Sequence, residues 1–146
     1  MMNILVVVED NRGSMHRMSK EAIAGAQKIG GNITALVIGA NADAIADQLS
    51  SIALENTLVV KHELVSSYNS DGYTEVVKQV IQSINPSIII IGHTYQTRDF
   101  MPRVSARLDI PFIPDIIGLE QDAYTKQVLN SKLNSSVSSL SDMKIL

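Results

Sequence analysis

The residues whose types could support chemistry follow one apolar run, Ile88 to Ile91, in the second half of the chain. Gly92 ends this run, a polar segment continues to Asp99, and a helical pattern begins after it. A short, continuously apolar run is typical of a strand buried in a parallel sheet, so the loop lies at the carboxyl end of such a strand. Ligands and partners bind at this edge of open α/β sheets, and the segment from Gly92 to Asp99 is therefore the first candidate functional surface.

Two interpretations of His93 follow from its place in this loop. As a general base, the imidazole would need a hydrogen-bonding partner and a substrate pocket. In the simpler interpretation, which we favour, the ring hydrogen-bonds the backbone of its own loop. The other histidines, His16 and His62, are expected on the surface. Three scattered histidines and no cysteine predict no metal site, no disulfide and no thiol catalysis.

Arginines occupy three positions in and after this loop. Arg103 and Arg107 are four residues apart and share a helix face, and Arg98 precedes them. The three guanidinium groups could hold a carboxylate or a phosphate, or dock an acidic partner. Alternatively, they form a solvated face with local ion pairs to Asp99 or Asp109, and spacing leaves both interpretations open. The candidate loop or interface residues are Thr94, Arg98, Asp99 and Arg103.

Motifs that bind phosphate or activate a nucleophile do not occur. The sequence has no Gly-x-x-x-x-Gly-Lys-Ser/Thr loop, no Gly-x-Gly-x-x-Gly after its first strand and no Gly-x-Ser-x-Gly elbow. Two carboxylates, Glu9 and Asp10, follow the first apolar run, where an anion would need bare N–H groups. We therefore expect no catalytic residue, and we assign these two carboxylates to a turn.

Apolar runs alternate with amphipathic segments along most of the chain. This βαβαβαβα order predicts an α/β fold with a doubly wound, mostly parallel sheet and helices on both faces. The expected strands are Ile4–Val8, Asn32–Ile38, a run within Thr57–Leu64, Ile88–Ile91 and Asp115–Glu120. The expected helices begin at Ser14, after Asn41, at Ser70 or Asp71, and near Asp99, which would place Pro102 in a first turn.

The segment after residue 120 has a different pattern. Leu129, Leu133 and Val137 alternate with polar residues, which predicts antiparallel or exposed-edge strands. The chain then enters a new apolar run, Met143–Leu146, and ends there. We expect this run to be a strand of a sequence cut from a longer protein, and the alternative is a natural C-terminal edge strand.

Composition limits the class of protein. The chain has 146 residues, 45% of them apolar and 18% charged, which predicts one folded domain. The net charge of −3 argues against a nucleic-acid binder, which would normally carry a basic face. No apolar run approaches the roughly 18 residues of a membrane span, so we expect no membrane insertion. The absence of cysteine fits a reducing cytoplasm, and the first ten residues are typical of a core strand rather than a signal peptide.

Residues 98–108, Arg-Asp-Phe-Met-Pro-Arg-Val-Ser-Ala-Arg-Leu, resemble a segment of the α subunit of electron transfer flavoproteins, which include the FixB-type proteins. That family typically shows Gly-Arg-Asp-Leu-x-Pro-Arg-x-Ala-x-Arg-Leu. The opening strand with Glu9, the step Pro114-Asp115-Ile116 and the segment 128–137 are also similar, so the resemblance covers essentially the whole chain. Two departures are Thr97, where the family has glycine, and Leu129-Asn130-Ser131, where it has Tyr-Ala-Gly.

The resemblance implies a Rossmann-like domain, similar also to adenine-nucleotide α-hydrolases, over residues 1–146. In the family, a C-terminal domain missing from this chain binds FAD, and the β subunit holds AMP. Full-length relatives pair with that β subunit as heterodimers and carry electrons from acyl-CoA and other dehydrogenases, as in fatty acid β-oxidation, to the respiratory chain. The implied role is an electron-carrier scaffold in a bacterial cytoplasm, with no catalytic residue and no cofactor in this chain alone.

A second hypothesis is an independent adenine-nucleotide-binding protein of the universal-stress-protein type, whose fold is similar. That family usually places a glycine-rich loop with Gly-Ser after its fourth strand. Here the corresponding loop, residues 93–97, has no glycine beyond Gly92, which weakens the nucleotide hypothesis.

Overall fold

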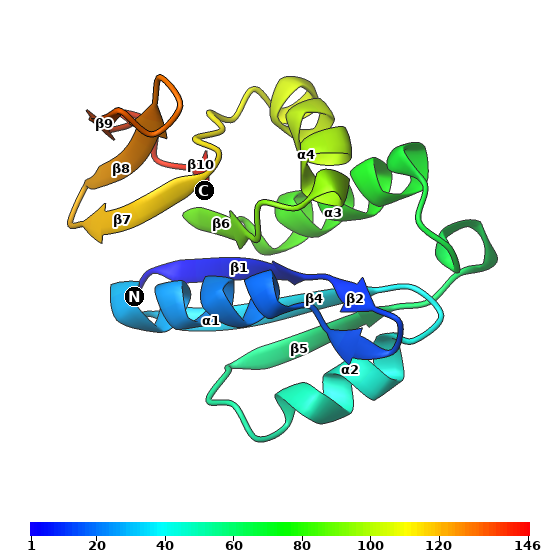
Figure 1. The fold of residues 1–146 in the computed structure, drawn as a ribbon. Helices are drawn as coiled ribbons and strands as arrows, with labels where there is room; N and C mark the ends of the chain where they lie inside the picture. The colour runs from blue at the N-terminus through cyan, green and yellow to red at the C-terminus, as the bar shows by residue number, and fades with distance from the viewer.

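A five-stranded parallel sheet forms the centre of the molecule in the computed structural model, which describes residues 1–146 (Figure 1). The strands lie in the order β10-β6-β1-β4-β5, and every neighbouring pair is parallel. This arrangement confirms the predicted α/β class. The strands are β1 (Asn3–Val8), β4 (Asn32–Ile38), β5 (Asn56–Val60), β6 (Ile88–Ile91) and β10 (Lys144–Ile145).

Helices cover both faces of this sheet, as the alternation of elements predicts. Side chains of β1 alternate between the faces, so that Ile4, Val6 and Val8 pack with α1 and α2, whereas Leu5 and Val7 pack with α3 and α4. Every residue from Ile4 to Val8 is buried, as expected for a central parallel strand. The helices are α1 (Arg17–Ile29), α2 (Ala42–Leu49), α3 (Ser70–Ile84) and α4 (Tyr95–Leu108), with a 3₁₀ turn, η1 (Glu63–Val65), before α3.

The first helix does not begin at Ser14, contrary to the prediction. Ser14 belongs to a small hairpin, β2 (Asp10–Asn11) with β3 (Ser14–Met15), whose turn is Arg12 and Gly13 at φ of 54° and 88°. Two residues with positive φ make the tight turn that suits a twisted hairpin. His16 caps the helix instead, because its Nδ1 accepts a hydrogen bond from the Met18 N–H at 3.1 Å.

The fourth helix also begins earlier than predicted. Thr94, not Asp99, is the N-cap, and its Oγ1 accepts a hydrogen bond from the Thr97 N–H at 3.2 Å. Pro102 therefore lies inside the helix rather than in its first turn. Threonine is among the residues that cap helices well, and the buried Thr97 extends the buried face of α4 back by one turn.

The antiparallel strands predicted after residue 120 form a separate three-stranded sheet with β7, in the order β7-β8-β9. This small sheet lies beside the β10 edge of the main sheet (Figure 1). Tyr124 connects the two, because its side chain is buried in the core formed by α1, α2 and the main sheet. The strands are β7 (Ile116–Glu120), β8 (Ala123–Val128) and β9 (Leu133–Val137).

We expect Ser131→Gly to stabilise the β8–β9 hairpin. The turn residues Leu129, Asn130 and Ser131 all have positive φ, at 53°, 54° and 66°. This conformation costs a residue such as serine about 1 kcal/mol, and glycine avoids most of that cost. Amide hydrogen exchange in β8 is expected to slow about threefold. Ser136→Gly within β9 is the control and should accelerate exchange, whereas unchanged or faster exchange in the Ser131 variant would contradict the prediction.

Candidate interaction site at the carboxyl edge of the sheet

The carboxyl ends of β1 and β6 lie side by side at the centre of the main sheet. The chain progresses from β1 toward β5 on one side and from β6 toward β10 on the other, so the strand order reverses between β1 and β6. This reversal is the topological switch point, where ligands bind in open α/β folds. The residues that follow the two strands, Glu9 after β1 and Gly92 to Thr94 after β6, therefore form the candidate site.

A direct contact joins the two sides of this switch point. The Thr94 hydroxyl donates a hydrogen bond to Glu9 Oε2 at 2.5 Å, and the Glu9 N–H donates one to Ser19 Oγ at 2.8 Å. Thr97 Oγ1 donates to the Gly92 carbonyl at 2.6 Å. The hydroxyl groups of Thr94 and Thr97 are thus satisfied from within the chain. The Glu9 carboxylate lies where a helix N-terminus would otherwise attract an anion, and it opposes phosphate binding there.

The expected assignment of Glu9 and Asp10 to a turn holds for Asp10 alone. Asp10 Oδ1 accepts a hydrogen bond from the Gly13 N–H at 2.6 Å within the hairpin turn. Glu9 instead reaches Thr94, a residue 85 positions away in the sequence. Sequence spacing could not show this contact because it depends on the parallel register of β1 and β6.

His93 does not hydrogen-bond its loop, so the favoured interpretation is wrong. Its Nδ1 is buried and has no hydrogen-bond partner. The ring lines a cavity between α1 and β7. No side chain hydrogen-bonds it as a general base would require, so the alternative interpretation gains no support either.

The three arginines separate into two environments. Arg103 pairs with Asp71 at 3.0 Å and Arg107 with Glu75 at 3.8 Å, so both connect α4 to α3 rather than to the expected Asp99 or Asp109. A hydrogen bond from Gln79, together with Lys78 and Arg107, holds the pKa of the Glu75 carboxyl below its usual value. Both pairs are exposed to solvent, so neither is expected to contribute much to the stability of the fold.

Arg98 has no carboxylate partner and remains at the surface. Its guanidinium lies 5.8 Å from the ring centre of Tyr95, which is 88% exposed. Of the four predicted candidates, Thr94 lies at the switch point and Arg98 on the open surface of the first turn of α4. Asp99 and Arg103 hold neighbouring elements together.

Asp99 accepts a hydrogen bond from the Tyr68 hydroxyl at 2.5 Å. Tyr68 belongs to an aromatic cluster with Tyr73 and Phe100, whose ring centres are 4.9–6.2 Å apart. Burial, followed by the hydrogen bond to Asp99 and the charge of that carboxylate, raises the pKa of Tyr68 above its ordinary value. Asp99 therefore holds Tyr68 in the aromatic cluster, and Phe100 of this cluster belongs to the start of α4.

Alkaline titration should detect this contact. The pKa of Tyr68 is higher in the folded than in the unfolded chain, so its contribution to stability is complete below about pH 10 and decreases as pH rises above that value. We expect one late-titrating phenol to move toward the ordinary pKa in Asp99→Asn, measured by phenolate absorbance. Asp109→Asn is the control. An unchanged titration curve in the Asp99 variant would show that the carboxylate has no such influence.

The small sheet exposes more apolar surface than sequence reasoning anticipated. Leu129 at the β8–β9 turn is 68% exposed and Leu133 is 57% exposed, and Val128 lies directly opposite Leu133 in the ladder. Ile117 on β7 and Leu140 after β9 are exposed as well. The alternation of Leu129, Leu133 and Val137 was the available signal, but it could not show which of these side chains lacks a cover.

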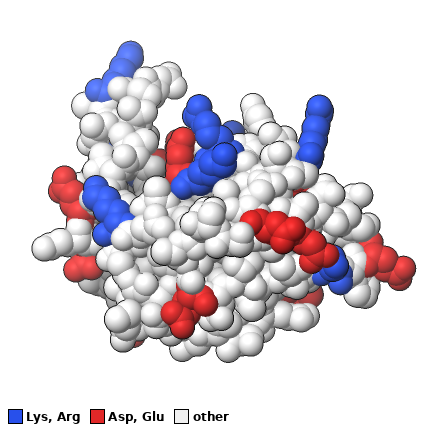
Figure 2. Space-filling view, turned by 90° about the horizontal axis from the view of Figure 1, so that it is seen from below, with Lys and Arg blue, Asp and Glu red and all other residues white.

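Charged side chains do not gather in a patch comparable with the exposed apolar side chains of the small sheet. Lysine and arginine side chains are interspersed with acidic ones over the face seen in Figure 2. The chain contains no group of three histidine, cysteine or acidic residues that could hold a metal ion. None of its helices combines the length and the apolar character needed to cross a membrane.

Comparison with known proteins identifies the family. The family model described as "Electron transfer flavoprotein domain" matches residues 4–146, almost the entire chain. This chain belongs to the electron transfer flavoprotein domain family. The predicted resemblance to that family is thereby confirmed.

Individual relatives of this electron transfer flavoprotein domain carry matching names. The electron transfer flavoprotein subunit alpha of Bacillus subtilis is 32% identical over 116 residues, 78% of this chain and 36% of that protein. The subunit alpha of Clostridium acetobutylicum is 28% identical over 133 residues, 88% of this chain and 40% of that protein. The acryloyl-CoA reductase electron transfer subunit beta of Anaerotignum propionicum is 27% identical over 124 residues, 82% of this chain and 34% of that protein. The chain thus spans well under half the length of these relatives.

Proposed function

We propose that residues 1–146 form the N-terminal scaffold domain of an electron transfer flavoprotein α subunit. The match of the family model to residues 4–146, with relatives named as α subunits, carries this proposal. The domain pairs with a β subunit and supports a flavin domain, outside this chain, that carries electrons from acyl-CoA and other dehydrogenases to the respiratory chain. The subunit named for acryloyl-CoA reductase supports a dehydrogenase acting on CoA thioesters as the electron donor.

The domain itself acts as a non-catalytic carrier component. FAD binds to the flavin domain and AMP to the β subunit, whereas this chain holds neither and works in a bacterial cytoplasm. The contact between Glu9 and Thr94 supports this division, because it places a carboxylate at the position where the fold would receive a phosphate.

The exposed apolar side chains of the small sheet supply the pairing surface. Leu129 and Leu133 stand at the tip of a hairpin, and a partner that covers them gains the free energy of removing apolar surface from water. Tyr124 fixes the sheet in the core of the domain, so the tip is presented on a rigid base. Rigid presentation favours association because little conformational freedom is lost on binding.

Calorimetry with the purified chain tests the division of roles. We expect no heat of binding for ATP or AMP at about millimolar concentration, and no flavin absorbance after purification. A dissociation constant for ATP near micromolar would overturn the proposal in favour of the stress-protein type. A flavin spectrum at one equivalent per chain would also contradict it.

A further inference from the structure

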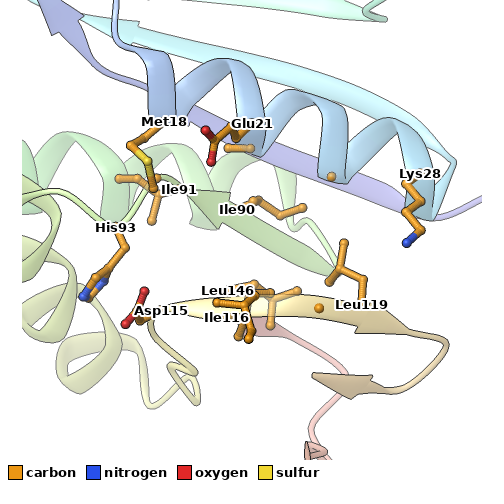
Figure 3. A pocket seen from close by; sticks show the side chains of 15 residues that line it. Met18, Glu21, Lys28, Ile90, Ile91, His93, Asp115, Ile116, Leu119 and Leu146 are labelled. Carbon is orange, nitrogen blue, oxygen red and sulfur yellow. The ribbon is translucent and has the colours of Figure 1, made fainter. Parts of the chain in front are cut away.

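The two edges of the main sheet differ in whether their backbone groups are covered. At the β10 edge, the Ile145 N–H donates to the Pro111 carbonyl and the Ile145 carbonyl accepts from the Ile113 N–H, both at 2.9 Å. The small sheet lies over the same end, where Leu119 of β7 packs against the core that contains Leu146 (Figure 3). At the opposite edge the strand order ends at β5, and no further segment of the chain pairs with its outer side.

Thr57 and Val59 carry the free backbone groups of the β5 edge. The Val60 carbonyl accepts a hydrogen bond from the Gly39 N–H at 3.0 Å, so the backbone groups of Val60 face β4. Successive residues of a strand direct these groups to opposite sides, so Thr57 and Val59 direct theirs away from β4. Both side chains are exposed, Val59 to 38%, so neither residue is shielded from an added strand.

The sequence of β5, Asn-Thr-Leu-Val-Val, has none of the features that normally keep an edge strand unpaired. Such edges commonly carry lysine or proline, contain a bulge, or lie under a loop or a helix. β5 has no charged residue and no proline, and its register with β4 continues without a shift from Asn56 to Val60. An edge of this kind is a template for a further strand, which gains backbone hydrogen bonds and covers apolar side chains.

Opposite charges flank β5 at its two ends. Glu55 precedes the strand, is exposed, and takes part in none of the ion pairs of the chain. Lys61 follows the strand, and its side chain pairs with Asp43 of α2 but remains 52% exposed. An antiparallel strand with the same flanking charges, centred on the same residue, brings an acid opposite each lysine. A second copy of β5 is such a strand.

One antiparallel register satisfies the backbone groups and the charges together. With Leu58 opposite Leu58 of the other copy, Thr57 of each copy lies opposite Val59 of the other. These residues all direct their backbone groups outward, so both pairs exchange hydrogen bonds across the two strands. The same register places Glu55 of each copy opposite Lys61 of the other, and opposite charges at such positions stabilise strand pairing.

We propose that β5 pairs with β5 of a second copy of this chain, antiparallel about a two-fold axis, so that the main sheet continues through both copies. The neighbouring registers that keep the backbone bonds place Glu55 opposite Val59 or Glu63 and lose both charge pairs. The contact is isologous, so it closes as a dimer. It uses one short strand from each copy, and interfaces of this size are weak, so we expect a dissociation constant of about 100 µM.

This surface is independent of the proposed pairing with a β subunit. β5 and the small sheet lie at opposite edges of the main sheet (Figure 1). Leu133→Asp, in the small sheet, should therefore leave dimerisation through β5 unchanged. Loss of either association would leave the other intact, so the two proposals can fail separately.

Sedimentation equilibrium of the chain between about 10 µM and 1 mM tests the dimer, and exchange of the flanking charges tests its register. Glu55→Lys and Lys61→Glu should each weaken the dimer at least fivefold, because each replaces two ion pairs by two like-charge contacts. An equimolar mixture of the two variants should associate like the original chain, since every lysine again meets an acid. This recovery also shows that both variants are folded.

Amide hydrogen exchange identifies the strand. Thr57 and Val59 should exchange about fourfold more slowly at about 1 mM chain than at about 20 µM, because a dissociation constant of about 100 µM leaves about one fifth of the chain monomeric at the higher concentration. Leu58 and Val60, whose amides face β4, should not respond to concentration. A chain that stays monomeric at about 1 mM, a mixture no better associated than the single variants, or loss of the dimer in Leu133→Asp would each overturn the proposal.

Discussion

Replacement of Gly92 by alanine is expected to destabilise the domain by about 3 kcal/mol, measured by denaturant unfolding. A Cβ on Gly92 would lie 2.6 Å from the Met18 Cβ and 3.0 Å from the Met18 carbonyl carbon. The obstacle includes backbone, so α1 would have to move away from β6 as a unit. Because the same movement would open the cavity and displace Ser19 from Glu9, the variant should lose order at the carboxyl edge as well.

Gly25→Ala, on the helix α1 that Gly92 contacts, is the matched control. A Cβ there meets only the Leu119 Cδ1, at an ordinary contact distance of 3.6 Å. Alanine is the better helix former, so this variant should be neutral or more stable by up to about 1 kcal/mol. If Gly92→Ala proved as stable as Gly25→Ala, the close approach of α1 to β6 would be wrong.

Replacement of Tyr124 by alanine should cost about 4 kcal/mol and detach the small sheet from the domain. Tyr124 is 2% exposed and packs into the core of α1, α2 and the main sheet, although it belongs to β8. Burial raises the pKa of its hydroxyl above the ordinary value, with a smaller contribution from Asp122. Because the alanine variant loses the packing of the Tyr124 ring, amide hydrogen exchange should accelerate throughout β7–β9, beyond what the loss of global stability explains.

Tyr124→Phe separates the ring from the hydroxyl. The ring supplies the packing and the hydroxyl has no hydrogen bond to another residue of the chain, so the expected change is within about 0.5 kcal/mol. A loss of several kcal/mol in the phenylalanine variant would show that the hydroxyl, and not the ring, holds the small sheet.

Local sequence patterns predicted most of the layered fold. The bounds of β4 and β6 coincide with the predicted runs, because strands buried on both faces are mostly apolar and stand out from the polar segments around them. The predicted start of α4 was wrong. Thr94 and Asp99 can both cap a helix, and the burial of Thr97 and Phe100 favours the earlier start.

Contacts between distant segments decided the site, and sequence could not show them. Asp71 and Glu75 accept the pairs from Arg103 and Arg107 because α3 and α4 pack side by side, whereas spacing suggested only neighbours within α4. The switch-point contact between Glu9 and Thr94 likewise depends on which strands become neighbours. The glutamate was visible after the first strand, but its partner was not.

The most direct test of the proposed scaffold role is association with the electron transfer flavoprotein β subunit of the same organism, measured by sedimentation velocity. We expect a one-to-one complex, with Leu129→Asp and Leu133→Asp each weakening it at least tenfold, as substitutions at central apolar contacts do. Leu64→Asp, at a leucine that is 71% exposed outside the small sheet, should leave the affinity unchanged. Absence of a complex at micromolar concentrations, or equal loss in all three variants, would contradict the account.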